Sequence, residues 1–264
     1  MSIHSRLSNP SLHVQWHGAG APLLLLHGWG MNGAVWQSIT ADLAAAGFRV
    51  GLVDLPGFGH SAPLPGARLA ELAKAVLTEV QAPTHLLGWS LGGLVATQMA
   101  LLAPERVASL VTVASSPAFQ AAEGWGGIKP EVLSQFGEQL AADLPRTLER
   151  FLALQAMGSA TAREDVRVLR AAIAQSPAPD AEALADGLAI LREADLRSRV
   201  AGIRPPWLRL YGRLDGLVPA RTVAQVDAMA PQSQSVILPK ASHAPFISHR
   251  EQTLSELKRF YLTL

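Results

Sequence analysis

Hydrophobic residues along the chain gather in short, uninterrupted runs, each followed by glycine or proline and then by a segment with helical spacing. Because their apolar residues do not alternate with polar ones, such runs are typical of strands buried on both faces, as in a parallel sheet covered by helices. The segment 12–18, LHVQWHG, alternates more and is expected to form an antiparallel edge strand. The pattern predicts an α/β fold with a mostly parallel central sheet. The six runs are residues 22–30, 49–59, 84–90, 107–116, 206–212 and 234–243.

The region between the fourth and fifth runs has a different character. From about residue 118 to 204 the pattern contains no convincing strand, and helical stretches begin near Lys129, Pro145, Thr161 and Asp180. Prolines fall between these stretches, where proline fits best. We therefore expect a helical insertion in the α/β core.

Composition and charge narrow the classes of function. The chain has 264 residues, 49% hydrophobic and 16% charged, which is typical of one globular α/β domain. A net charge of +1 argues against nucleic acid recognised over the whole surface. Without cysteine there is no disulfide, thiolate nucleophile or Cys-ligated metal, and a reducing compartment is favoured. Residues 1–18 contain no secretory signal and no apolar stretch reaches the ~20 residues that span a bilayer, so a soluble cytoplasmic protein is expected.

One serine is surrounded by glycines at the end of the third run. Gly88-Trp89-Ser90-Leu91-Gly92 has the Gly-x-Ser-x-Gly pattern of a nucleophile elbow. Neighbours without a Cβ allow the sharp strand-to-helix turn that exposes the Ser90 hydroxyl, and the following helix directs its N-terminal dipole at that site. The alternative is an ordinary strand–turn–helix joint with an incidental serine.

A serine hydroxyl needs a base to accept its proton, and the base needs an acid to orient it. In this fold the order along the chain is Ser, then Asp or Glu, then His. The histidine must therefore lie downstream of the serine and the acid, which leaves His243 and His249. His243 directly follows the last strand-like run, whereas His249 begins the final helix, where a capping or solvated role is expected. Asp215 follows a strand after a short turn, whereas Asp195 belongs to a helical stretch. We predict His243 as base and Asp215 as acid, with an ordinary Asp-Gly turn as the alternative for the latter.

Acyl transfer also creates an oxyanion that must meet preorganised donors, usually two backbone N–H groups. The predicted donors are Leu91, which follows the nucleophile, and Trp29, in the His-Gly-Trp-Gly cluster after the first run. The segment 54–61, DLPGFGHS, is interpreted as a structural turn. The chain contains no phosphate-binding or dinucleotide-binding glycine motif and no metal-ligand spacing of histidines and carboxylates, so no cofactor and no metal are expected.

Together these motifs resemble those of the α/β-hydrolase superfamily over the whole chain. A finer likeness lies in residues 146–165, RTLERFLALQAMGSATARED, which are similar to the pimeloyl-[acyl-carrier protein] methyl ester esterases of biotin synthesis. The resemblance implies an α/β-hydrolase core at 1–117 and 191–264 and a helical lid at 118–190. The motifs in order are HGWG, DLPGFGHS, GWSLGG, YGRLDGLVP and SHAPF.

The same resemblance implies where the substrate binds. An apolar tunnel suits a seven-carbon acyl chain, and a lid helix could supply it; the alternative is that its residues are lid core. The implied substrate-binding residues are Phe151, Leu152, Ala153, Leu154 and Gln155, with Trp29, Ser90, Leu91 and His243 at the inner end.

A carrier-linked substrate also requires a docking face, which should be basic because acyl carrier proteins are acidic. Arginines spaced at i, i+4 and i, i+4, i+7 in the lid should share helix faces. Alternatively, they form a solvated face paired with Glu149, Glu164 and Asp165. The resemblance implies docking at Arg146, Arg150, Arg163 and Arg167, with Arg170 on the same face as the last two.

The expected function is a serine carboxylesterase that hydrolyses the methyl ester of pimeloyl-[acyl-carrier protein] to free pimeloyl-[acyl-carrier protein] and methanol. The alternatives are a general short-chain carboxylesterase or C–C bond hydrolase of the same fold, and a binding module that rarely turns over. A haloalkane dehalogenase is disfavoured because its chemistry needs a carboxylate at Ser90. We expect a monomer with no nucleic-acid or membrane partner.

Overall fold

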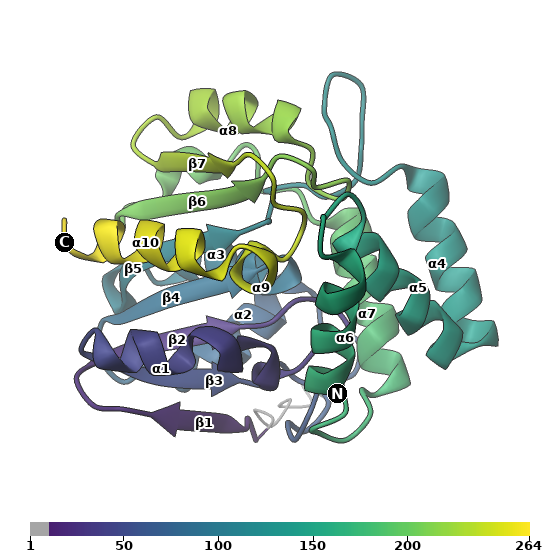
Figure 1. Ribbon diagram of the computed structural model, residues 1–264, viewed down its shortest axis with the longest axis horizontal. Helices are drawn as coiled ribbons and strands as arrows, with labels where there is room; N and C mark the ends of the chain where they lie inside the picture. The colour runs from purple at the N-terminus through teal and green to yellow at the C-terminus, as the bar shows by residue number, and fades with distance from the viewer. Residues whose placement is uncertain (1–10) are drawn as a thin grey trace, which may run out of the picture.

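A mixed sheet forms the centre of the molecule in the computed structural model, which describes residues 11–264 (Figure 1). The prediction that residues 1–18 contain no secretory signal concerns mostly residues 1–10, which lie outside the described residues. The sheet has seven strands in the order β1-β3-β2-β4-β5-β6-β7. β1 pairs antiparallel with β3 at one edge and all other pairs are parallel, so the predicted sheet and its edge strand are confirmed. The strands are β1 (Val14–His17), β2 (Ala21–Leu26), β3 (Phe48–Val53), β4 (Thr84–Trp89), β5 (Val107–Val113), β6 (Trp207–Gly212) and β7 (Gln234–Leu238).

The uninterrupted apolar runs exist because the sheet is covered on both faces. In β2, Leu23 and Leu25 belong to one core cluster and Leu24 and Leu26 to another, as expected when successive side chains point to opposite faces. Figure 1 shows one helical layer in front of the sheet and a second behind it. The front layer holds α1 (Gln37–Ala45), α9 (Pro245–Ser248) and α10 (Arg250–Tyr261), and the rear layer α2 (Leu69–Leu77), α3 (Leu91–Leu102) and α8 (Val223–Met229).

A helical insertion separates β5 from β6 and stands at the carboxyl ends of the parallel strands (Figure 1). Its ends meet in an antiparallel bridge between Ala118 and Asp195. Asp143 and Asp180 cap two of the helices, accepting hydrogen bonds from the N–H groups of Arg146 (3.1 Å) and Ala183 (2.9 Å). The insertion consists of α4 (Pro130–Ala142), α5 (Leu144–Ala156), α6 (Ala162–Ile173) and α7 (Ala181–Glu193). Within residues 11–264, no helix is long and apolar enough to cross a membrane.

Candidate active site

The sharp turn at Ser90 depends on three glycines. Ser90 lies between β4 and α3 with φ 55° and ψ −120°, a strained backbone for a residue with a side chain. A Cβ on Gly88 would stand 2.3 Å from the carbonyl oxygen of Gly92, and a Cβ on Gly92 would stand 2.3 Å from that of Leu26. A Cβ on Gly93 would stand 2.5 Å from the Cβ of Ser115. These contacts explain why glycines surround the serine.

Hydrogen bonds from neighbouring strands hold this backbone in place. The Ser90 N–H donates to the carbonyl of Val113 at 3.0 Å. The Ser90 carbonyl accepts from the Ser115 hydroxyl at 2.8 Å and from the N–H of Gly93 at 3.0 Å. The strained turn is therefore fixed by β5 on one side and by the start of α3 on the other.

The structure brings Ser90, His243 and Asp215 together in one buried chain of hydrogen bonds. His243 Nε2 lies 2.9 Å from Ser90 Oγ, and His243 Nδ1 lies 2.8 Å from Asp215 Oδ2. Because a carboxylate only accepts, Nδ1 carries the proton and Nε2 is free to accept one from the serine. The other Asp215 oxygen, Oδ1, accepts from the N–H groups of Leu217 (2.8 Å) and Val218 (3.0 Å). This arrangement can activate a serine hydroxyl as a nucleophile.

The two rival residues lie elsewhere in the molecule. Asp195 binds the guanidinium and N–H of Arg197. His249 precedes α10, with its Nδ1 2.9 Å from the Ser248 hydroxyl.

Three contacts that were not part of the sequence prediction position the loop carrying His243. The Trp89 indole donates to the His243 carbonyl at 2.7 Å. The His243 N–H donates to the carbonyl of Gln155 at 3.2 Å, at the end of α5. A Cβ on Gly212 would stand 2.0 Å from the Ser242 carbonyl oxygen, so a glycine lets β6 approach this loop closely. All three contacts join residues far apart in the sequence, and only the glycine after a buried strand gave a signal.

The two N–H groups expected to meet an oxyanion are both free. Among residues 11–264, neither the Trp29 N–H nor the Leu91 N–H donates to a protein acceptor. Both residues are buried, at 1% and 0% exposure. Buried backbone donors are nearly always paired, so two free ones beside a serine are suited to a ligand atom.

His27, which sequence reasoning passed over, fixes the loop that carries Trp29. Its Nδ1 donates to the carbonyl of Gly28 at 2.8 Å, and its Nε2 accepts from the N–H of Leu55 at 3.0 Å. Burial lowers the pKa of His27, more than the Gly28 carbonyl and Asp54 raise it, which favours the neutral ring that these bonds require. Asp54 accepts from the N–H of Gly33 at 2.7 Å, in agreement with a structural role for this turn. The position of His27 at the head of the HGWG motif was the available signal.

The five consecutive residues expected to line an acyl channel do not share one face of α5. Phe151 is buried against Trp29, with ring centroids 4.7 Å apart at 69°. Phe151 and Trp29 belong to one core cluster, whereas Leu152 is buried in the other. Ala153 is exposed and Leu154 is half-buried. An α-helix turns about 100° per residue, so five successive side chains point in all directions. The five residues therefore lie on different sides of α5, with Ala153 on its exposed side, and their contact with an acyl chain stays a prediction.

Gln155 is the most unusual of these five residues. The residue is buried, at 1% exposure. Neither its Oε1 nor its Nε2 has a hydrogen-bond partner within residues 11–264. A buried amide with both polar atoms free is rare, because leaving them unpaired is costly.

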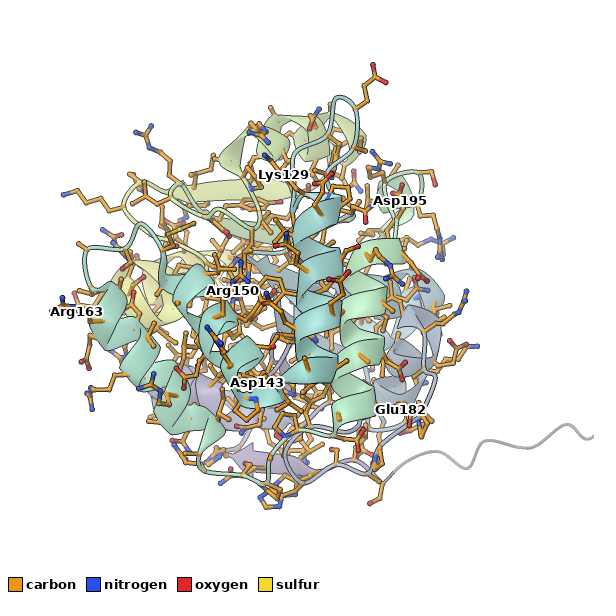
Figure 2. All side chains as sticks on the ribbon, turned by 90° about the vertical axis from the view of Figure 1, so that its right-hand side faces the viewer. Lys129, Asp143, Arg150, Arg163, Glu182 and Asp195 are labelled. Atoms are coloured by element: carbon orange, nitrogen blue, oxygen red, sulfur yellow. The ribbon has the colours of Figure 1, made fainter. Side chains whose placement is uncertain are left out.

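The four arginines expected to dock a carrier are exposed on the outer side of the insertion, where Figure 2 labels Arg150 and Arg163. Arg146 and Arg150 line a groove of about 730 Å³, together with Asp143 and Glu149. The alternative of a solvated face with acidic partners also has support, because two arginines of α6 are paired within the insertion. Arg167 pairs with Glu164 at 2.6 Å and Arg170 with Glu149 at 2.5 Å.

Comparisons with known proteins agree with this geometry. A family model described as alpha/beta hydrolase fold matches residues 21–250. The pimeloyl-[acyl-carrier protein] methyl ester esterase of Aliivibrio fischeri is 52% identical over 95% of this chain and 97% of that protein. The protein of that name from Photobacterium profundum is 54% identical over 93% and 96%. An esterase from Exiguobacterium antarcticum has a TM-score of 0.86 over 95% of both chains at 22% identity, a likeness of fold.

Proposed function

Because the chain belongs to the α/β-hydrolase fold family and, within it, to the pimeloyl-[acyl-carrier protein] methyl ester esterases, we propose that it hydrolyses the methyl ester of pimeloyl-[acyl-carrier protein]. The products are free pimeloyl-[acyl-carrier protein] and methanol. The observation that carries the proposal is the hydrogen-bonded chain of Ser90, His243 and Asp215, in a protein about half identical to esterases of that name.

We assign the reaction steps from the geometry of the site. Ser90 Oγ attacks the ester carbonyl while His243 Nε2, 2.9 Å away, takes its proton. Asp215 holds the other ring nitrogen and stabilises the imidazolium. Methanol then leaves with the proton from His243, and water, activated by the same ring, attacks the acyl-enzyme and releases the carboxylate and Ser90.

The negative oxygen of each tetrahedral intermediate is assigned to the free N–H groups of Trp29 and Leu91. Donors fixed before the reaction need no reorganisation, and losing one typically lowers kcat by about 10²- to 10³-fold. Every step moves a proton among serine, imidazole, substrate and water. The mechanism therefore requires no metal and no organic cofactor.

For the acyl chain we propose contact with Trp29 and Phe151, whose rings pack edge-to-face and offer an apolar wall. Gln155 is proposed to hydrogen-bond a polar atom of the substrate, because both ends of its buried amide are free. Leu152 is buried in the other core cluster, whereas half-buried Leu154 packs against the cluster of Trp29 and Phe151 and can contribute at the edge of this wall. Ala153 is left out of the proposal.

Docking of the acidic carrier is proposed on the outer face of the insertion. Arg146 and Arg150 border the groove, and Arg163 and Arg167 lie on the neighbouring helix α6. Because the pair between Arg167 and Glu164 is exposed to solvent, it contributes little to stability, and a carrier carboxylate can replace it at little cost. The net charge of +1 means that attraction must come from this local set.

The mechanism is tested with Ser90→Ala and with a fluorophosphonate probe. Wild-type protein is expected to hydrolyse p-nitrophenyl butyrate and to label rapidly at Ser90, as identified by peptide mass spectrometry. Ser90→Ala is expected to do neither while keeping its circular-dichroism spectrum. Turnover retained by the folded variant would refute the mechanism, and a wild-type serine that labels only slowly would favour a binding module.

Carrier docking is tested by reversing charge at Arg146 and Arg150, both to Glu. A matched control reverses Lys258 and Arg259 on α10, which are also exposed, for the same change in net charge. We expect only the first variant to lose kcat/KM on the carrier-linked methyl ester, with the loss shrinking at high salt, while butyrate hydrolysis is unchanged. Equal losses on both substrates, or in both variants, would refute the docking face.

A wild-type enzyme that turns over butyrate as efficiently as the carrier-linked ester would instead be a general carboxylesterase. We also propose that the enzyme is cytoplasmic, since a chain without cysteine suits a reducing compartment. We further propose that it is a monomer. Light scattering after size exclusion tests the monomer.

A further inference from the structure

The indole ring of Trp29 attaches the oxyanion loop, the segment after β2 that carries Trp29, to the helical insertion. Trp29 Nε1 donates to the carbonyl of Leu184 on α7 at 2.8 Å. The ring is 1% exposed and packs edge-to-face on Phe151 of α5. The residue whose N–H is assigned to the oxyanion therefore has its side chain fixed by the insertion, although its backbone belongs to the core.

Gly187, one turn after Leu184 on α7, provides the space for this ring. A Cβ at Gly187 would stand 2.7 Å from Trp29 Cδ1 and 3.1 Å from Trp29 Nε1, where ordinary contacts begin at 3.4 Å. The same Cβ would lie 3.5 Å from Leu91 Cδ2. One position on α7 thus faces the side chains of both proposed oxyanion donors.

Backbone geometry gives no other reason for a glycine at this position. Gly187 lies inside α7 without a positive φ, and glycine inside a helix is less favourable than alanine. Gly137, inside α4, makes a useful contrast, because a Cβ there would meet nothing within 4 Å. What distinguishes Gly187 is its contact with Trp29.

We propose that Gly187 is a positioning residue: by admitting the Trp29 indole onto α7, it holds the Trp29 N–H where it stabilises the oxyanion. The inference rests on the proposed function and deepens it. It makes the strength of the oxyanion hole depend on the position of α7.

The test compares Gly187→Ala with Gly137→Ala, two glycine-to-alanine changes inside helices of the insertion. Each enzyme is measured for kcat and KM on p-nitrophenyl butyrate, for inhibition by an alkyl trifluoromethyl ketone, and for thermal midpoint. The ketone forms a tetrahedral adduct on the serine whose oxyanion needs the same donors. Trp29→Phe is added because it keeps an aromatic ring but removes the bond to Leu184, and it serves if Gly187→Ala does not fold.

Gly187→Ala and Trp29→Phe are expected to lose about tenfold in kcat, less than complete loss of a donor, and in Gly187→Ala, which leaves the ring in place, KM should change less than twofold. The inhibition constant of the ketone should rise by the same factor as kcat/KM falls. Gly137→Ala should behave as wild type. A wild-type kcat in Gly187→Ala, or a rise in KM alone, would overturn the positioning role and leave the proposed function intact. A wild-type chain without esterase activity would overturn both.

Discussion

Replacing Asp215 by asparagine should leave the active site in place and put its proton on the wrong nitrogen. Asp215 Oδ1 accepts two backbone N–H groups, from Leu217 and Val218, and only an oxygen can do so. In Asp215→Asn the amide oxygen must keep that position, so the NH₂ group turns toward His243. Because NH₂ donates, His243 Nδ1 must lose its hydrogen and accept instead, and the proton moves to Nε2. Nε2 then donates to Ser90 and can no longer take its proton.

The expected loss is about 10⁴-fold in kcat, the size seen when this change traps the wrong tautomer in a serine hydrolase. At about 1.4 kcal/mol per decade, that is about 5 kcal/mol of transition-state stabilisation. Stability should change much less, because both backbone bonds remain; each 1 kcal/mol lost lowers the thermal midpoint by about 2–4 °C in a protein of this size.

Steady-state hydrolysis of p-nitrophenyl butyrate, with a thermal melt of the same samples, measures both effects. Asp195→Asn is the matched control, since Asp195 is partly exposed and pairs with Arg197, and it should keep kcat within about twofold of wild type. If Asp215→Asn kept a tenth of the activity, or if the two variants lost activity equally, the assignment of Asp215 as the orienting acid would be wrong.

Three further changes test the elbow, the loop that carries Trp29, and the end of helix α10. Gly88→Ala places a Cβ 2.3 Å from the carbonyl oxygen of Gly92, and displacing the elbow should lower kcat at least about a hundredfold. Burial lowers the pKa of His27, so the unfolded chain binds the extra proton first, and stability should be lost as the pH falls below about 6.5. The urea midpoints measured at pH 7.5 and at pH 5.5 should therefore differ less in His27→Gln than in the wild-type protein. The buried Tyr261 hydroxyl has no partner within residues 11–264, so Tyr261→Phe should keep or raise the urea midpoint, and a loss above about 1 kcal/mol would contradict this.

Features set by local chain geometry could be predicted from the sequence. Uninterrupted leucines in β2 follow from a strand with a core on each face, and the glycines around Ser90 follow from contacts within a few residues or with the adjacent strand. Asp215 and His243 could be predicted because parallel strands deliver the loops after them to the same edge of the sheet. This part of the site is a consequence of topology.

Features set by packing between distant segments could not be predicted. Which side of α5 faces the core depends on its contacts, so Phe151 and Ala153 were expected on the same lining although one is buried and the other exposed. The bond from the Trp89 indole to the His243 carbonyl joins residues that no pattern relates. A role for Gly187 could not be predicted for the same reason, since it depends on the Trp29 ring, which comes from another part of the chain.

The attachment of the His243 loop to the end of α5 limits how this enzyme can open or be reduced in size. The carbonyls of Gln155 and Met157 hold Ser242 through its hydroxyl, at 3.1 and 2.7 Å, and that of Gln155 also holds the His243 N–H. A shortened protein that lacked the four inserted helices would uncover the nucleophile and would leave its proton acceptor held only by core residues, the Trp89 indole and Asp215. Any opening that leaves the base in place must therefore preserve this junction between the insertion and the core.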